Sequence, residues 1–296
     1  MLGKEAAVWL PTGTLANHLA VRILAGNQRR VLVQAESHLY NDCGDCAQTL
    51  SGLTLIPLAP GKATFSLADV ERAANDAMMG RVVVPVGAIQ IETPVRRRQG
   101  EQFDFEEMRR ISMWARERRV GLHLDGARLL IECAYSGRTV KEYTALFDTV
   151  YVSMYKFFNA ASGAILAGPK KLLDGLYHTR RMFGGGLPHA WPFAAVSLHF
   201  AQGFEKRMRA AVENAERVIG LLAKDSNFSI ERVGNGTNIF RMHVANVNPP
   251  VYQGRLELAG IVARVPAGDK FSLQVNETWA RVSAEEIAAR FRRAMG

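Results

Sequence analysis

The segment Thr149-Val-Tyr-Val-Ser-Met-Tyr-Lys156 is an apolar run that ends in a lysine. Its β-branched and aromatic residues predict a buried strand, which places Lys156 just past the end of that strand. A lysine there either extends its side chain to water or has its ammonium group desolvated, which lowers its pKa and makes the neutral amine a nucleophile. Judged from this segment alone, a surface lysine is the commoner outcome. The rest of the chain therefore decides between a surface lysine and a desolvated amine.

The composition limits the possible classes of protein. The 296 residues are 48% hydrophobic, which is enough for a large core and a second, smaller domain. No apolar run approaches the roughly 18 residues that span a bilayer, and Met1-Leu-Gly-Lys-Glu5 does not resemble a signal peptide. We therefore expect a cytoplasmic protein with no membrane partner, whose net charge of +9 suits an anionic ligand.

Two local motifs are predicted to have no role in the function. The run Arg96-Arg-Arg98 lacks interleaved aromatic residues, so it predicts a solvated loop rather than a nucleic-acid site. Cys43-Gly-Asp-Cys46 is a CxxC motif, but the sequence shows neither a second pair of metal ligands nor a thioredoxin-like context. Because three cysteines make no even disulfide framework, we expect a structural role for this motif and no metal site.

Strand and helix patterns alternate over about the first 170 residues. The expected strands are Ala6–Leu10, Arg30–Gln34, Thr54–Leu58, 82–91, 120–125 and 149–152, and the expected helices are 14–24, 67–79 and 105–119. This alternation predicts an α/β fold with a mostly parallel sheet flanked by helices. In such sheets ligands bind beyond the carboxyl ends of the strands.

Four candidate residues follow strands of this predicted sheet: Gly13, His38, Asp125 and Lys156. Gly13 and Thr14 open a helix whose free N–H groups and dipole favour an anion such as phosphate. A buried Asp125 would need a cation or a hydrogen-bond donor. A nucleophilic lysine, a carboxylate that protonates a pyridine nitrogen, a flat histidine and a phosphate cradle together match what pyridoxal phosphate requires.

The C-terminal third predicts a smaller α+β domain. Apolar spacing from residue 188 to 224 predicts long helices. The strands expected after them are 228–233, 237–244, 261–265 and 271–275, with a helix near 250–259 and a final helix that Ser283 caps. We therefore expect a cofactor-binding large domain at residues 1–203 and a small domain at residues 204–296.

Four segments together resemble the motifs of the threonine aldolase and β-eliminating lyase family of fold-type I pyridoxal phosphate enzymes. They are Leu10-Pro-Thr-Gly-Thr-Leu-Ala-Asn17, Glu36-Ser-His38, His123-Leu-Asp-Gly-Ala-Arg-Leu129 and residues 148–156. Their order and spacing match from Met1 to about Gly186. The resemblance implies a phosphate site at Gly13, Thr14 and Ser153, and a Schiff base between the cofactor and Lys156. It also implies that His38 stacks on the cofactor ring, that Asp125 pairs with the ring nitrogen and that Arg128 contacts the cofactor or the substrate carboxylate.

The sequence also departs from the family pattern. The family usually has a few dozen residues before the position of Met1, including a serine that helps to hold substrate, and we expect this chain to lack that arm. Tyr155-Lys156-Phe-Phe158 replaces Ser-Lys-Gly-Leu, and Thr93-Pro-Val95 replaces Asn-Thr-His. Pro188 occupies the place of an arginine that reaches a neighbouring subunit, and residues 271–277 contain no clear carboxylate-binding arginine. We expect cofactor binding to survive these losses better than aldol cleavage.

The function implied by the resemblance is that of a pyridoxal phosphate lyase. It would cleave a β-hydroxy amino acid such as L-threonine or L-allo-threonine to glycine and an aldehyde, with His38 or an ordered water as the base. Two alternatives remain open: a β-eliminating lyase that gives a keto acid and ammonia, and a truncated cofactor-binding remnant without catalysis. The resemblance further implies a homodimer or homotetramer.

Overall fold

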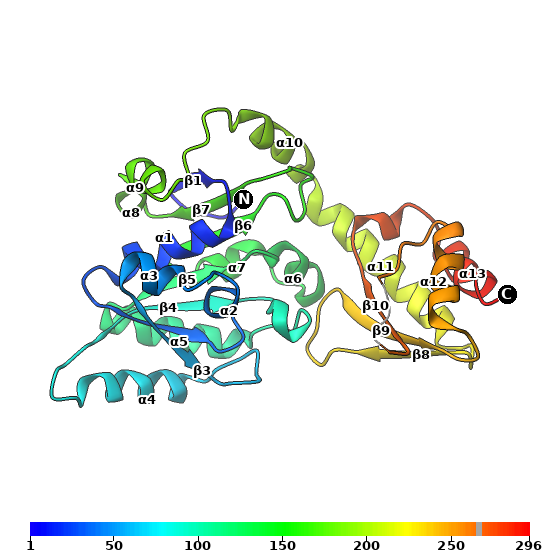
Figure 1. Ribbon diagram of the computed structural model, residues 1–296, viewed down its shortest axis with the longest axis horizontal. Coiled ribbons are helices and arrows are strands. Elements are labelled where there is room, and N and C mark those ends of the chain that lie inside the picture. Colours follow the sequence, from blue (N-terminus) through cyan, green and yellow to red (C-terminus); the bar gives the residue numbers. More distant parts are fainter. Residues whose placement is uncertain (265–267) are drawn as a thin grey trace. The chain divides into compact units, whose positions relative to one another are not determined.

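The structure is a computed structural model that describes residues 1–264 and 268–296, and the chain forms two compact units (Figure 1). The first unit comprises Met1–Cys133 and Gly137–Gln202, and the second comprises Ala134–Ser136 and Gly203–Gly296. The large-domain boundary predicted from the sequence, after residue 203, lies one residue from the end of the first unit. Within the described residues, no helix is both long enough and apolar enough to cross a membrane.

The first unit is built on a seven-stranded sheet with the strand order β1-β7-β6-β5-β4-β2-β3. Strand β7 is antiparallel to β1 and β6, and the other neighbouring strands are parallel, so the predicted mostly parallel sheet is confirmed. The strands are β1 (Ala6–Leu10), β2 (Arg30–Gln34), β3 (Thr54–Leu58), β4 (Val86–Glu92), β5 (Gly121–Asp125), β6 (Thr149–Ser153) and β7 (Ala164–Gly168).

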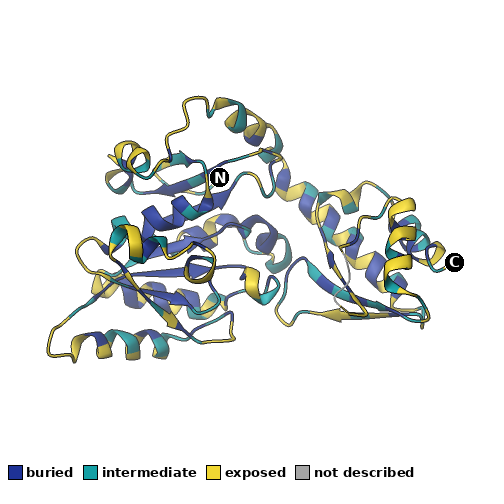
Figure 2. Ribbon diagram, in the orientation of Figure 1, coloured by how far each residue is buried: buried dark blue, intermediate teal, exposed yellow. Residues whose placement is uncertain are grey.

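Helices cover this sheet, and α1 (Gly13–Ala25) is the most deeply buried of them. Figure 2 shows α1 and the sheet largely buried, whereas α4 presents an exposed face. The chain enters α1 through Thr12, whose side chain accepts a hydrogen bond from the N–H of Leu15. The other helices that begin in this unit are α2 (His38–Asn41), α3 (Cys46–Ser51), α4 (Leu67–Met78), η1 (Arg96–Arg98), α5 (Phe105–Arg118), α6 (Leu129–Ser136), α7 (Val140–Thr144), α8 (Lys170–Leu173), α9 (Leu176–Met182) and α10 (Trp191–Ala201). The last three residues of α6 belong to the second unit.

Strand β4 differs from the sequence prediction in a way that matters for the site. It begins at Val86 instead of residue 82, because residues 82 and 83 are largely exposed and outside the sheet. It also continues one residue further, to Glu92, which pairs in register with Asp125 of β5. Two carboxyl groups therefore lie side by side at the carboxyl edge of the sheet.

The second unit contains a three-stranded antiparallel sheet with the order β10-β9-β8. Its elements are α11 (Phe204–Leu222), β8 (Phe228–Arg232), β9 (Ile239–Val244), α12 (Pro249–Leu258), β10 (Lys270–Gln274), η2 (Glu277–Ala280) and α13 (Ala284–Arg293). The predicted strand at 261–265 is wrong for residues 261–264, which form no strand, and Val265 lies outside the described residues. Apolar residues there line a cavity instead of pairing with a neighbouring strand.

Glu132 of α6 is a fully buried carboxyl group that the sequence analysis did not identify. Its Oε2 accepts a 2.5 Å hydrogen bond from the hydroxyl of Thr93. Burial raises the pKa of Glu132 from 4.5 to about 7, and hydrogen bonds from Thr93 and Tyr143 reduce that rise. Because the pKa in the folded chain exceeds the unfolded value, the stability that Glu132 contributes below pH 4.5 is lost as the pH rises through 7.

Replacing Glu132 with glutamine should therefore stabilise the chain at alkaline pH. A neutral amide accepts the hydrogen bond from Thr93 without a buried charge, so we expect a gain of about 2–3 kcal/mol at pH 8. The gain should disappear near pH 4, where the glutamic acid is itself neutral. Urea unfolding from pH 4 to pH 8 measures this difference, with exposed Glu71→Gln as the control. An equal effect of Glu132→Gln on the free energy of unfolding at pH 4 and at pH 8 would contradict a raised pKa for Glu132.

Candidate active site

The four candidate residues predicted at strand ends lie along one edge of the sheet. Strands β1 and β6 are both antiparallel to β7, so they run in the same direction, and β6, β5, β4 and β2 are mutually parallel. Gly13 and His38 therefore follow the carboxyl ends of β1 and β2, and Asp125 and Lys156 lie at or just beyond those of β5 and β6. The structure brings these segments to the edge where parallel sheets bind ligands.

Charges couple the residues of this edge to one another. Burial lowers the pKa values of both His38 and Lys156, the carboxylate of Asp125 opposes both shifts, and the ammonium of Lys156 lowers the pKa of His38 further. Arg128, which directly precedes α6, lowers the pKa of Lys156 and of Glu92. These five residues therefore form one electrostatic cluster, which we call the rim cluster.

Asp125 is held in place by a chain of buried polar groups. Its Oδ2 accepts a 2.5 Å hydrogen bond from Asn17 Nδ2 in α1, and its Oδ1 accepts one of 3.1 Å from the N–H of Ala127. His123 Nε2 in turn donates to Asn17 Oδ1 at 2.9 Å, and the hydroxyl of Thr149 donates to His123 Nδ1 at 2.9 Å. Burial lowers the pKa of His123 to about 4, so this ring is neutral at pH 7. The chain of hydrogen bonds fixes the orientation of the Asp125 carboxylate.

Glu92 connects the rim cluster to two loops. Its Oε2 accepts a 2.5 Å hydrogen bond from the N–H of His38, and its Oε1 accepts one of 2.9 Å from the N–H of Arg96. Burial and the neighbouring Asp125 carboxylate raise the pKa of Glu92 to about 7. Glu92 thereby fixes the start of α2, and with it the backbone from which the His38 ring projects.

The first turn of α1 provides a cradle for an anion. Thr12 caps the N–H of Leu15, whereas the N–H groups of Gly13 and Thr14 precede the first helical hydrogen bonds. A Cβ atom added to Gly13 would lie 2.0 Å from the hydroxyl oxygen of Tyr151, so only glycine fits there. Within the described chain, the buried hydroxyls of Tyr151 and Ser153 interact with each other, and that of Tyr151 also with Tyr155, but neither completes a well-aligned hydrogen bond. Such unsatisfied groups next to a helix N-terminus fit a phosphate group.

Lys156 lies three residues beyond β6, in a turn, with a partly buried side chain. Burial lowers its pKa from 10.5 to about 8, helped by Arg128 and opposed by Asp125 and Glu92. Its Nζ lies 5.7 Å from the centre of the Tyr155 ring, which is itself 44% exposed. Of the two outcomes considered for Lys156, this environment favours the desolvated amine over the surface lysine. The amine of Lys156 is therefore substantially neutral near pH 8.

The nucleophilicity of Lys156 should rise over an unusually low pH range. We expect its modification by a limiting amount of an amine-reactive ester to increase through pH 8, because the neutral amine is the reacting form. Peptide mass mapping from pH 6 to pH 11 follows this reaction, and the exposed Lys171 provides an internal reference. A profile at Lys156 that begins to rise only near pH 10 would contradict a desolvated amine.

The departures from the family pattern also have structural consequences. Val95, in the place of a histidine, is fully buried and offers no polar group, and its N–H donates to the carbonyl of Glu101. Pro188 lies in the loop after α9 and lines a cavity of about 320 Å³ with Arg180 and Arg181. The predicted solvated Arg96–Arg98 run is a short 3-10 turn whose side chains pair with Asp42 and Glu101.

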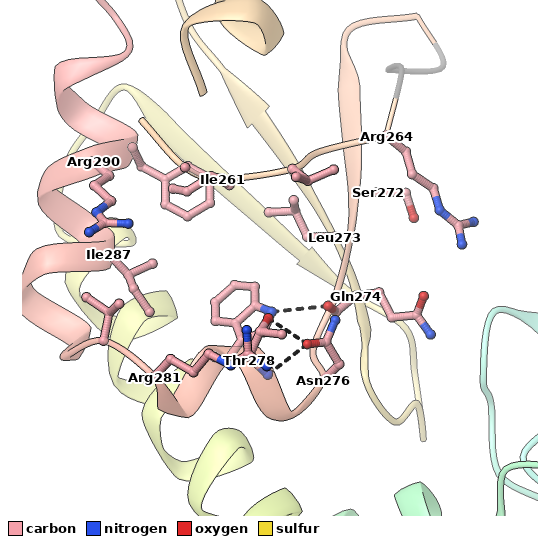
Figure 3. A pocket seen from close by; sticks show the side chains of 15 residues that line it. Ile261, Arg264, Ser272, Leu273, Gln274, Asn276, Thr278, Arg281, Ile287 and Arg290 are labelled. Carbon is pink, nitrogen blue, oxygen red and sulfur yellow. Dashed lines mark hydrogen bonds between the residues drawn. The ribbon is translucent and has the colours of Figure 1, made fainter. Parts of the chain in front are cut away.

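A larger cavity, of about 580 Å³, lies within the second unit and contains none of the predicted site residues (Figure 3). Residues 260–264, β10, η2 and α13 surround it, and Arg264, Arg281 and Arg290 contribute cationic groups. The indole N–H of Trp279 donates to the carbonyl of Gln274 at 3.1 Å along its wall. Cavity size alone would therefore select this cavity of the second unit as the candidate site, instead of the rim cluster.

Sequence reasoning missed the residues that support the cluster. The sequence motifs contain Asn17 and His123 but assign them no role, and the sequence pattern places Glu92 only at the end of a strand and Tyr151 only within one. The available signal was a polar side chain within an apolar strand or helix face, which requires a buried partner. That signal does not name the partner, since Asn17 and Asp125 are 108 residues apart in the chain.

Comparison with known proteins agrees with this arrangement. The family model described as "Beta-eliminating lyase" matches residues 1–245. Alanine racemase TOXG of Cochliobolus carbonum is 33% identical over 188 residues, which cover 62% of this chain and 47% of that protein. A probable low-specificity L-threonine aldolase of Schizosaccharomyces pombe is 27% identical over 273 residues, covering 90% of this chain and 69% of that protein. The chain thus spans about half to two thirds of the length of these two relatives.

Solved structures give the same picture for the fold. A putative L-allo-threonine aldolase from Listeria monocytogenes EGD-E has a TM-score of 0.80 and 27% identity, covering 99% of this chain and 82% of that one. A putative aromatic amino acid beta-eliminating lyase/threonine aldolase from Exiguobacterium sp. 255-15 has a TM-score of 0.81 and 25% identity, covering 99% and 83%. With the rim cluster in place and a family model that matches most of its length, the chain belongs to the beta-eliminating lyase family.

Proposed function

We propose that the chain is a pyridoxal phosphate-dependent lyase that cleaves a β-hydroxy amino acid, such as L-threonine or L-allo-threonine, to glycine and an aldehyde. The observation that carries the proposal is the desolvated Lys156, whose lowered pKa is coupled to Asp125 and His38 at one edge of the sheet. The names of the aldolase relatives support the choice of reaction. A cytoplasmic location remains part of the proposal.

The residues present fit pyridoxal phosphate. The N–H groups of Gly13 and Thr14, with the unsatisfied hydroxyls of Tyr151 and Ser153, would bind the phosphate. Asp125, oriented by Asn17, would keep the pyridine nitrogen protonated, and the amine of Lys156 would hold the cofactor covalently. When bound, the cofactor supplies an electron sink for the bond that breaks at the α-carbon.

Side chains that contact the substrate would carry out the remaining steps, which are binding of the substrate carboxylate and removal of the β-hydroxyl proton. Arg128 carries the cationic group of the rim cluster that would bind the substrate carboxylate. Burial lowers the pKa of His38, so its imidazole is neutral near pH 7 and can accept the proton of the β-hydroxyl directly or through a water. Orientation matters as much as proton transfer, because aldol cleavage requires the Cα–Cβ bond perpendicular to the cofactor plane.

Product analysis tests this proposal against its competitors. Protein reconstituted with pyridoxal phosphate is incubated separately with L-threonine, L-allo-threonine and L-alanine. Glycine with acetaldehyde supports the proposal, and 2-oxobutyrate without glycine would establish β-elimination instead. One relative is named an alanine racemase, so D-alanine is assayed in the incubation with L-alanine. D-alanine from L-alanine, with no glycine from either form of threonine, would show that the chain is a racemase instead of a lyase. No product from any substrate would favour a cofactor-binding remnant.

We also propose that the chain assembles as a homodimer or homotetramer, since enzymes of this fold build their sites at subunit interfaces. Pro188 in place of an arginine should weaken the contact between subunits without abolishing it. Sedimentation velocity measures the assembly state. A strictly monomeric chain that binds the cofactor tightly would contradict the proposal.

A further inference from the structure

The CxxC motif adopts a closed turn that brings the backbones of its two cysteines close together. The N–H of Cys46 donates to the carbonyl of Cys43 at 3.3 Å, and the intervening Gly44 and Asp45 both have positive φ, of 58° and 51°. This is the pattern of a type I′ turn, which brings its first and last Cα atoms within about 7 Å. A disulfide requires about 4.4–6.8 Å between Cα atoms, so the backbone is already arranged for one.

The thiols of Cys43 and Cys46 are both free, and each lies close enough to the other to shift its pKa. Cys46 is partly exposed, and the neighbouring thiol of Cys43 lowers the pKa of Cys46, with smaller contributions from the backbone N–H groups of Ala47 and Cys46. The neighbouring thiol of Cys46, together with burial, raises the pKa of Cys43. Cys46 is therefore the more accessible thiol and the one that loses its proton more readily, and Cys43 is the buried partner that can resolve a mixed disulfide on Cys46.

The buried partner contacts residues of the candidate site. Cys43 Sγ lies 3.2 Å from Nδ1 of His38, within hydrogen-bond distance, and the Cys43 thiol also interacts with the side chain of Thr14. His38 is the proposed ring-stacking residue, and Thr14 belongs to the proposed phosphate cradle. A change in the bonding of this one sulfur atom therefore acts on the candidate site, most directly through His38.

We propose that Cys43 and Cys46 form a reversible disulfide with low-molecular-weight disulfides as the oxidant, and that its formation weakens cofactor binding. The thiolate of Cys46 attacks one sulfur of the oxidant, forms a mixed disulfide and expels the first small thiolate. Cys43 then loses its proton to that thiolate, attacks the sulfur of Cys46 and expels the second one. Two protein thiols are oxidised, and one small disulfide is reduced to two thiols.

The effect on the cofactor follows from the contacts that Cys43 gives up. As its sulfur bonds to Cys46, it no longer partners Nδ1 of His38, and the imidazole is free to turn away from the cofactor. We expect the cofactor affinity to fall about fivefold, the factor that corresponds to one typical hydrogen bond. This second part rests on the proposed function, whereas the disulfide itself does not.

The disulfide is tested first, without the cofactor. The reduced chain is equilibrated with mixtures of oxidised and reduced glutathione, and free thiols are counted with a chromogenic reagent. We expect the count to fall from three to one, with peptide mass mapping placing the link between Cys43 and Cys46. The Cys133→Ala control should lose both of its remaining thiols, and Cys46→Ser should form no internal link. A count that stays at three, or a stable mixed disulfide on Cys46, would overturn the proposal.

The coupling to the site is tested next, by two measurements. The Nδ1 resonance of ¹⁵N-labelled His38 should shift on oxidation of the natural chain and stay unchanged in Cys46→Ser, whether or not cofactor binds. Titration with pyridoxal phosphate should show the fivefold loss of affinity only where the disulfide forms. Equal affinity in both redox states would overturn the coupling. Failure of the reduced chain to bind the cofactor would refute the proposed function. The thiol count would still show whether the disulfide between Cys43 and Cys46 forms.

Discussion

Replacing Lys156 with alanine abolishes the covalent attachment of the cofactor and lowers turnover at least about a thousandfold, because no other amine takes its place. The fold should remain, since Lys156 lies in a turn beyond β6 and its stem is not part of the core. Removing a partly buried cation also relieves the desolvation that lowers its pKa. The thermal midpoint of the variant should therefore equal or exceed that of the natural chain.

The measurement combines spectroscopy with chemical trapping. The natural chain with pyridoxal phosphate is reduced with borohydride, digested and mapped, and we expect the added mass on the peptide that contains Lys156. In Lys156→Ala the cofactor should bind without becoming fixed to the chain. Lys171→Ala removes an exposed lysine and should behave like the natural chain. Trapping at the same level on another lysine of the variant would refute the role of Lys156.

Replacing Asp125 with asparagine should leave cofactor bound but lower turnover by about two to four orders of magnitude. A neutral amide cannot keep the pyridine nitrogen protonated, so the ring would accept electrons poorly. The structure adds a second effect. Both carboxylate oxygens of Asp125 accept hydrogen bonds, from Asn17 and from the N–H of Ala127, so the amide NH₂ of asparagine must face one of these donors.

Rotating Asn17 relieves this mismatch only if the proton of His123 moves as well. Nε2 of His123 carries the proton because Asn17 Oδ1 can only accept; if Asn17 turned its NH₂ toward Nε2, the proton would have to move to Nδ1, and the hydroxyl of Thr149 would accept a hydrogen bond instead of donating one. We therefore expect a loss of about 1 kcal/mol in the free energy of unfolding, the size of one rearranged hydrogen bond, together with the catalytic loss. Denaturant unfolding and steady-state kinetics separate the two effects, because a purely structural defect would not lower kcat of the folded fraction.

Asp148 provides the matched control for this variant. Its Oδ2 accepts a 2.8 Å hydrogen bond from the N–H of Leu122 at the beginning of β5, at the opposite end of the strand from Asp125. Asp148→Asn should cost some stability and leave kcat unchanged. Comparable losses of turnover in the two variants would show that charge at the ring nitrogen is not what Asp125 provides.

Much of the architecture follows from the sequence alone. Three strands were predicted with the bounds that the structure has, because short β-branched runs between polar turns leave little choice of boundary. The positions of Gly13, His38, Asp125 and Lys156 after strands required only the alternation of strands and helices. Strand β7 was missed, since a five-residue apolar run has no periodicity that separates strand from helix.

The tertiary structure decided which groups meet and how their chemistry changes. Lys156 could be either a surface lysine or a desolvated amine as long as only its neighbours in sequence were known. Burial lowers its pKa, Arg128 lowers it further, and Asp125 and Glu92 oppose the shift, and the folding of the chain creates all of these surroundings. Desolvation and charge coupling are properties of three-dimensional surroundings, and a sequence pattern specifies them only through the fold.

The same holds for the CxxC motif and for the support of Asp125. The sequence determined that two cysteines are three residues apart, which fixes neither the turn between them nor the distance from Cys43 to His38. It determined that Asn17 and His123 are polar residues in apolar surroundings and must find partners. Only the packing of α1 against β5 decided that these partners are Asp125 and one another, because hydrogen bonds between distant residues form where the core brings their atoms within about 3 Å.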